Sequence, residues 1–149
     1  MDSYILPLHG RVLGFDQSTL EDFMQEFLND GQISLVEYAQ ERGMKNNAAH
    51  RFVFTLSAVT GINSNDRLMV RKLLENGFRI SRGAKPDSFT IEEVEFIKNG
   101  RRSDVLEYLI RHRLLTYAQA KYLRKRLLKD ETNKSIKIVD EEPPDAIYM

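Results

Sequence analysis

Helix-start signals recur along this chain at intervals of roughly a dozen to twenty residues, and they limit how long any helix can be. Three of them have the form of a capping box, in which a Ser or Thr side chain covers a backbone N–H and a Glu reaches back. They are Ser18–Glu21, Ser34–Glu37 and Thr90–Glu93. Asn-Gly or Asp-Gly pairs close several of the segments. This punctuation predicts short helices and excludes a long coiled coil.

Apolar residues follow these signals at helical spacing, so we expect an all-α fold. About seven short helices, packed as an orthogonal bundle, should form one helical domain over residues 1–130. They should begin near residues 18, 34, 48, 64, 90, 103 and 116. The length of 149 residues is enough for one buried core.

Three segments do not fit the helical pattern. The first fifteen residues could form a small N-terminal β-hairpin, with strands near 4–6 and 11–13, or an extended arm. Residues 78–80 are typical of a short strand. Residues 131–149 are rich in acidic residues and proline, which predicts a disordered, flexible acidic C-terminal tail.

The formal net charge is zero, but the charge is unevenly distributed. Residues 101–129 carry nine Lys or Arg against two Asp or Glu, whereas residues 1–60 and 130–149 are each net acidic. We expect a basic helical hairpin at 101–129. On its last helix, cations recur at three- and four-residue spacing and share one face, and two tyrosines that could stack on bases interleave with them. The residues are Lys121, Arg124 and Lys125, with Tyr117 and Tyr122.

Such a stripe is typical of nucleic-acid contact. The alternative is a solvated helix whose positive face meets an acidic surface, either of this chain, of its own tail or of a second copy. Both interpretations remain open from the sequence.

The segment 35–54 combines small and apolar residues with a glycine at a specific spacing. Ala39 lies four residues before Gly43, and apolar positions follow at Ala49 and Phe52. At this spacing two short helices cross through a tight turn. This stretch of about 20 residues resembles the helix-turn-helix of DNA-binding regulators. The resemblance implies that Ala39 lets the second helix approach the first and that Gly43 closes the turn, within a motif spanning 34–60.

The resemblance also implies which residues contact DNA. The second helix would begin near residues 45–47 and present its early residues to the major groove. Four side chains would then read bases, while Lys45 and the basic helix would hold phosphates. The base-reading residues would be Asn46, Asn47, His50 and Arg51. The same spacing also fits a helical hairpin inside the core, closed by a glycine C-cap.

Sequence signals for catalysis are missing. The absence of cysteine excludes disulfides, thiolate catalysis and cysteine-based zinc sites. His9, His50 and His112 have no second ligand at metal spacing, and no glycine-rich phosphate loop occurs. We therefore expect no enzyme, no metal and no cofactor. No run approaches the roughly 18 apolar residues of a membrane helix and no secretory signal is visible, so we expect a cytoplasmic protein without a membrane partner.

These observations predict a DNA-binding regulatory protein that uses a helix-turn-helix and a basic helix on double-stranded DNA. Because one such helix buries little surface, we expect a homo-oligomer. The alternative is a non-enzymatic oligomeric adaptor or structural protein that acts through protein–protein contacts. A protein partner for the acidic tail is also considered.

Overall fold

The computed structural model of the chain describes residues 3–9, 14–129 and 137–139. Within these residues it has seven helices and four short strands, which confirms the all-α expectation in its main point. The helices are α2 (Gln17–Asn29), α3 (Leu35–Glu41), α4 (Asn46–Thr60), α5 (Asp66–Asn76), α6 (Ile91–Asn99), α7 (Arg102–Arg113) and α8 (Tyr117–Leu128). The strands are β1 (Tyr4–Pro7), β2 (Phe78–Ser81), β3 (Ser88–Thr90) and β4 (Lys137–Val139).

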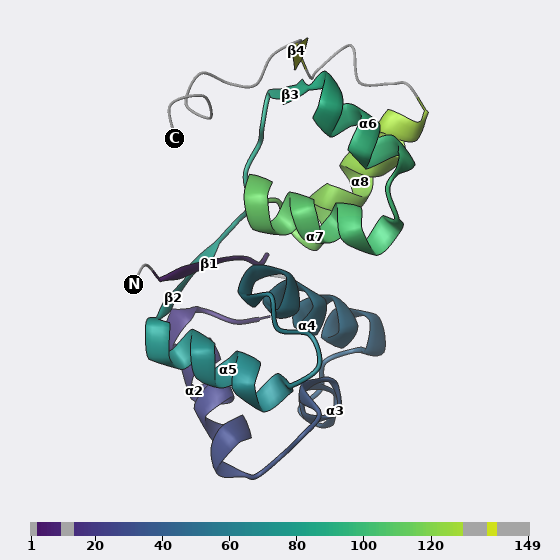
Figure 1. Cartoon of the computed structure of the whole chain (residues 1–149). Helices are drawn as coiled ribbons and strands as arrows, with labels where there is room; N and C mark the ends of the chain where they lie inside the picture. Colours follow the sequence, from purple (N-terminus) through teal and green to yellow (C-terminus); the bar gives the residue numbers. More distant parts are fainter. Residues whose placement is uncertain (1–2, 10–13, 130–136, 140–149) are drawn as a thin grey trace.

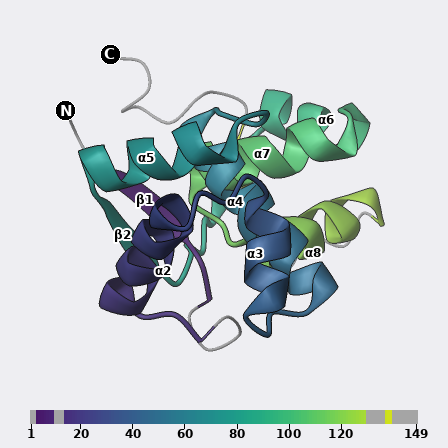
Figure 2. The same cartoon turned by 90° about the horizontal axis from the view of Figure 1, so that it is seen from below.

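The helices form two groups around α4. Figure 1 shows α2 to α5 with β1 and β2 in one half of the molecule, and β3, β4 and α6 to α8 in the other. Helix α4 packs against α3 and α5 in its own half and against α7 in the other half. The view from below places α4 in the middle of the assembly (Figure 2). It is therefore the element that joins the two halves.

Strand β1 is present where the sequence predicts an N-terminal strand, but its partner is different. It pairs in parallel with β2, with Tyr4 opposite Phe78 and Pro7 opposite Ser81. A hairpin joins antiparallel strands, whereas a parallel pair needs a long crossover, which helices α2 to α5 supply here. The hairpin expectation was therefore wrong in the partner of β1, and residues 11–13 lie outside the described residues. The short strand expected at 78–80 is confirmed as β2.

Strand β4 lies inside the segment expected to be a flexible tail. It pairs in parallel with β3, with Ser88 opposite Lys137 and Thr90 opposite Val139. Its β-branched residues Ile138 and Val139 favour extended backbone, which explains why these three positions depart from the expectation. The rest of the expected tail lies outside the described residues.

Most predicted helix starts are confirmed, but the cap of α2 is different. Ser34 and Thr116 are N-caps as expected, and Thr90 forms a complete capping box with Glu93. Helix α2 is capped by Asp16, whose carboxylate accepts the Thr19 N–H at 2.8 Å, instead of by Ser18. Ser18 donates its hydroxyl to the same carboxylate. A carboxylate can accept both bonds at once. Because Asp16 is the N-cap, the helix begins at the next residue, Gln17.

Two further helices begin earlier than predicted. Helix α4 starts at Asn46 instead of Ala48, and its N-cap, Lys45, makes no side-chain capping bond. Helix α7 starts at Arg102, so Ser103 is its second residue and not its cap.

The core of the first half contains a cluster of aromatic rings from α2, α3, α4 and the segment before α2. Phe23 lies at its centre, with ring centroids 5.1 Å from Phe15, 5.3 Å from Tyr38 and 5.9 Å from Phe52. Phe27 adds an edge-on contact with Tyr38 at 5.3 Å. Helices from three parts of the chain therefore depend on the same rings.

The turn between α3 and α4 has the form that the sequence predicts. Gly43 adopts a φ of 99°, which a residue with a side chain rarely does. Ala39 and Ala49 are both buried where the two helices pack together. Residues 42–45 thus form a tight turn between two helices that are in contact.

A partly buried ion pair links α6 and α7 in the second half. The Arg113 guanidinium lies 2.8 Å from the Glu93 carboxylate, which also accepts the Tyr108 hydroxyl at 2.7 Å and the Thr90 N–H at 3.1 Å. Burial alone would raise the pKa of Glu93, but these hydrogen bonds and the positive charge of Arg113 outweigh it and hold the pKa below its ordinary value. Arg113, one of the cations of the basic segment, therefore serves the fold.

Candidate functional site

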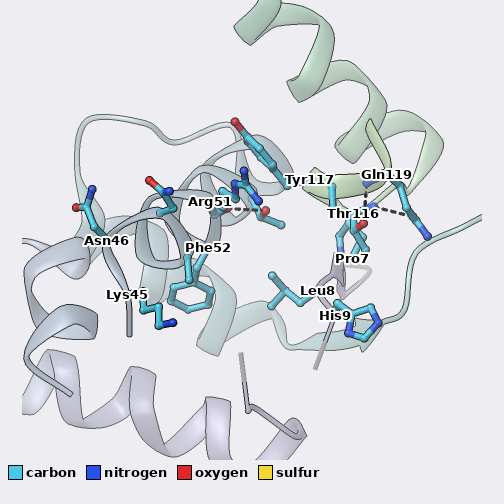
Figure 3. A pocket seen from close by; sticks show the side chains of 14 residues that line it. Pro7, Leu8, His9, Lys45, Asn46, Arg51, Phe52, Thr116, Tyr117 and Gln119 are labelled. Atoms are coloured by element: carbon cyan, nitrogen blue, oxygen red, sulfur yellow. Dashed lines mark hydrogen bonds between the residues drawn. The ribbon is translucent and has the colours of Figure 1, made fainter. Parts of the chain in front are cut away.

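A cavity of about 700 Å³ opens between the start of α4, the end of β1 and the start of α8. We call it the α4–α8 pocket. Figure 3 shows the α4 side chains on one side, with Leu8, His9 and the first residues of α8 facing them. It is lined by Pro7, Leu8, His9, Lys45, Asn46, Asn47, Ala48, Arg51, Phe52, Thr55, Thr116, Tyr117, Ala118 and Gln119.

Local sequence explains why three chain segments meet at this place. Leu8 directly follows β1. Its N–H donates to the carbonyls of Leu6 and Ser81, which holds this residue beside the end of β2. Leu114 takes a positive φ of 59° and ends α7, and the Thr116 capping box then starts α8 beside the pocket. The turn at Gly43 brings in the first residues of α4.

The pocket has an apolar floor and a polar rim. Phe52, Thr55 and Leu8 are buried beneath it, whereas Lys45 and Arg51 are exposed at its edge. None of the described residues that line it is acidic. Such a lining suits a ligand that combines an apolar or aromatic part with negative charge.

Arg51 and Tyr117 connect the two segments that the sequence analysis selected separately. The Arg51 guanidinium carbon lies 5.0 Å from the centre of the Tyr117 ring, a cation–π contact, and Phe54 packs edge-on against the same ring at 5.6 Å. Figure 3 shows Arg51 beside Tyr117. The first half of α4 and the start of the basic helix α8 therefore line one pocket.

The cations of α8 continue from the pocket wall along the helix. Lys121 and Lys125 follow Tyr117 by four and eight residues, so all three lie on one face, and both lysines are exposed. Arg124 is half-buried, and its Nε atom is buried without a hydrogen-bond partner among the described residues. Of the three predicted cations, Arg124 is the least accessible.

The predicted base-reading residues on α4 are all exposed. Asn46, Asn47 and Arg51 line the pocket, whereas His50 lies on the exposed side of the same helix and does not. The Asn46 side-chain oxygen accepts a hydrogen bond from Gln40 at 2.6 Å. Asn47 makes no side-chain hydrogen bond with other described residues, so its amide is available to a ligand. The C-terminal half of α4 is mostly buried, so only its first half can face a ligand.

Several lining residues were not found by sequence reasoning. His9, Thr116, Ala118 and Gln119 come from segments far from α4 in the chain, and only packing brings them to the pocket. From the sequence, Thr116 is expected to begin a helix, and nothing marks it as part of a site. For Tyr117 the sequence predicts only that its ring could stack on bases.

In the part of the chain that the structure describes, no three His, Cys, Asp or Glu side chains are placed to hold a metal ion. No helix there is long and apolar enough to cross a bilayer. Comparisons with protein-family models, curated proteins and solved structures found no match for this chain. The geometry of the pocket is therefore the basis for a functional proposal.

Gly83 couples the loop after β2 to the wall of the pocket. It has a φ of 96°, and a Cβ added there would overlap the Gln119 side chain and come within 3.0 Å of Thr116. Gln119 could move away only by giving up the bond in which its side-chain oxygen accepts the Thr116 N–H. We expect Gly83→Ala to lower the free energy of unfolding by about 2–4 kcal/mol, from backbone strain and overpacking together.

Gly43→Ala is the matched control, because Gly43 has nearly the same φ, 99°, but nothing within 4 Å of an added Cβ. This variant should lower the free energy of unfolding by the cost of backbone strain alone, about 1–2 kcal/mol. Urea denaturation of both variants measures the difference. Equal losses of unfolding free energy in the two variants would mean that the Gln119 side chain moves aside without destabilising the fold.

Proposed function

We propose that this protein is a DNA-binding regulator without catalytic activity, whose interface is the face formed by the first half of α4 and the exposed stripe of α8. We call this the α4–α8 face, with residues Lys45, Asn46, Asn47, His50, Arg51, Lys121 and Lys125. The observation that carries the proposal is the contact between Arg51 and Tyr117, in which the first half of α4 meets the start of the basic helix α8.

The turn between α3 and α4 supports the same proposal. A recognition helix reads bases with its N-terminal residues, and here the exposed residues of α4 are at its N-terminal end. Asn47 is the best candidate to pair with an adenine edge, because its amide has no partner among the described residues. Lys45, Arg51, Lys121 and Lys125 would neutralise phosphates. Action as a cytoplasmic dimer is part of the proposal, since one such helix buries little surface.

Salt dependence tests this proposal directly. If four cations neutralise four phosphates, the logarithm of affinity for random duplex DNA should fall with the logarithm of salt concentration with a slope of about −3 to −4. Arg51→Ala and Lys121→Ala, one from each segment, should each reduce the steepness by about one. Fluorescence anisotropy with a labelled duplex measures these slopes.

Lys72→Ala is the control, because Lys72 is an exposed cation on α5, outside the α4–α8 face. It should leave the slope unchanged. If Arg51→Ala and Lys121→Ala behave like Lys72→Ala, the α4–α8 face does not hold the DNA.

A second candidate function is an oligomeric adaptor that acts through protein contacts. It is favoured by large apolar side chains that are exposed on two helices in contact: Phe96 on α6, and Tyr122 and Leu128 on α8. An adaptor would form a multimer by light scattering yet would not bind duplex DNA at low salt. A Tyr122→Ser variant that turned the multimer into a monomer would favour this candidate.

A further inference from the structure

The α4–α8 pocket lies inside the proposed interface and, at about 700 Å³, is larger than contact with a phosphate backbone requires. We infer that it receives one unpaired nucleotide, with the base inside and the phosphate at the rim. This inference rests on the proposed function and specifies which form of nucleic acid the site prefers. A base within a duplex is stacked and paired, so it would have to leave the helix to enter.

The size and lining of the pocket fit a nucleotide. Its volume of about 700 Å³ falls in the range of sites that enclose small ligands. Above the buried Phe52 and Leu8, the half-buried ring of Tyr117 and the exposed Ala118 offer apolar surface to the face of a base. Asn47 and Gln119 supply amide groups at the edge of the same space, where a base carries its donors and acceptors.

The charges place the phosphate at the rim. Lys45 and Arg51 are exposed there, and no acidic side chain is found among the described lining residues. The first turn of α4 also lines this side, and its N-cap, Lys45, makes no side-chain hydrogen bond to the backbone N–H groups of that turn. These groups would add to the attraction that the two cations exert on a phosphate.

The cations beyond the pocket point to a strand as the source of the nucleotide. Lys125 follows Tyr117 by eight residues, which is about 12 Å along a helix. Only a ligand with further phosphates would reach both Lys121 and Lys125. A free mononucleotide shares the chemistry of the pocket but would leave these lysines unused.

The test uses the full chain with three probes: an oligothymidylate of about twelve nucleotides, its duplex with oligodeoxyadenylate, and thymidine monophosphate. We expect the single strand to bind at least about tenfold more tightly than the duplex at equal salt. Ala118→Phe fills the pocket and alters no charge, and Ala118 is exposed, so the fold should tolerate it. This variant should lower affinity for the single strand about tenfold and remove the preference over the duplex.

Ser103→Phe is the matched control, because Ser103 is also an exposed second residue of its helix but lies on α7, outside the pocket lining. It should bind like the unmodified protein. Asn47→Asp is a second variant that keeps the size of the side chain. It places a negative charge on the rim and should weaken binding of the strand more than tenfold.

The monophosphate distinguishes the two sources of the ligand. Competition by thymidine monophosphate only at millimolar concentration supports a strand, and competition at micromolar concentration supports a free nucleotide in the same pocket. Unchanged affinity of both variants for the strand and the monophosphate would overturn the inference. If the unmodified protein bound neither single strand nor duplex at low salt, the proposed function would fail. The monophosphate would then decide the inference alone: binding that Ala118→Phe abolishes would support it, and no binding would end it.

Discussion

Replacing Phe23 by alanine should lower the free energy of unfolding by about 3–5 kcal/mol, a large part of the stability of a typical domain. Phe23 is buried, and its ring contacts three other rings that belong to α3, α4 and the segment before α2. Alanine would leave a cavity that these helices cannot close without moving. Because α4 also contacts α7, the loss should be seen as one cooperative transition at lower denaturant concentration.

Two further variants separate the effect of the lost apolar volume from the effect of burial at this position. Phe23→Leu keeps most of the apolar volume and should cost about 1 kcal/mol or slightly more. Phe96→Ala removes the same atoms from an exposed position on α6, and we expect a loss below about 1 kcal/mol. Guanidinium denaturation of the three variants gives the comparison. A similar loss for Phe23→Ala and Phe96→Ala would mean that the aromatic cluster does not organise the core.

Breaking the ion pair between Glu93 and Arg113 should cost about 3 kcal/mol at neutral pH. The side chains are only 13% and 20% exposed, so either variant, Glu93→Ala or Arg113→Ala, leaves a largely buried charge without its partner. Arg113→Ala also removes the bond to the Ser88 carbonyl and the stacking on Phe89. The double variant should cost less than the sum of the two single variants.

The exposed pair between Arg42 and Asp30 is the control. Its atoms are 3.3 Å apart, but the side chains are 39% and 47% exposed. Solvent screens such a pair, so Arg42→Ala should cost no more than about 1 kcal/mol. Equal losses of unfolding free energy for Arg42→Ala and Arg113→Ala would contradict the structural role of the Glu93–Arg113 pair.

The same ion pair predicts a dependence of stability on pH. The pKa of Glu93 is lower in the folded chain than its ordinary value of 4.5, so the folded state favours the ionised carboxylate. Its contribution is therefore complete above the ordinary pKa and is lost as the pH falls through the folded-state pKa. Glu93→Gln should be less sensitive to acid than the unmodified protein when thermal unfolding is followed from neutral pH to about pH 3.

Local signals were sufficient to predict the helices and most of their ends. A cap such as Thr116 needs only its own neighbours, because its side chain bonds to a backbone N–H three residues away. The correct cap of α2 was missed because Asp16 and Ser18 compete for the same start, and only the geometry of the turn decides between them. The partner of β1 was missed for a different reason, since β2 follows four helices later.

In the candidate site, too, some features are local in the sequence and others depend on packing. A helical chain, a tight turn at Gly43 and the cations on α4 and α8 are all evident from the sequence, because they depend on residues a few positions apart. The contact between Arg51 and Tyr117, and the pocket that they line together with His9, Thr116 and Gln119, become visible only in the folded chain. These contacts follow from how α4 and α8 pack, and packing depends on the shapes of buried side chains across the whole core.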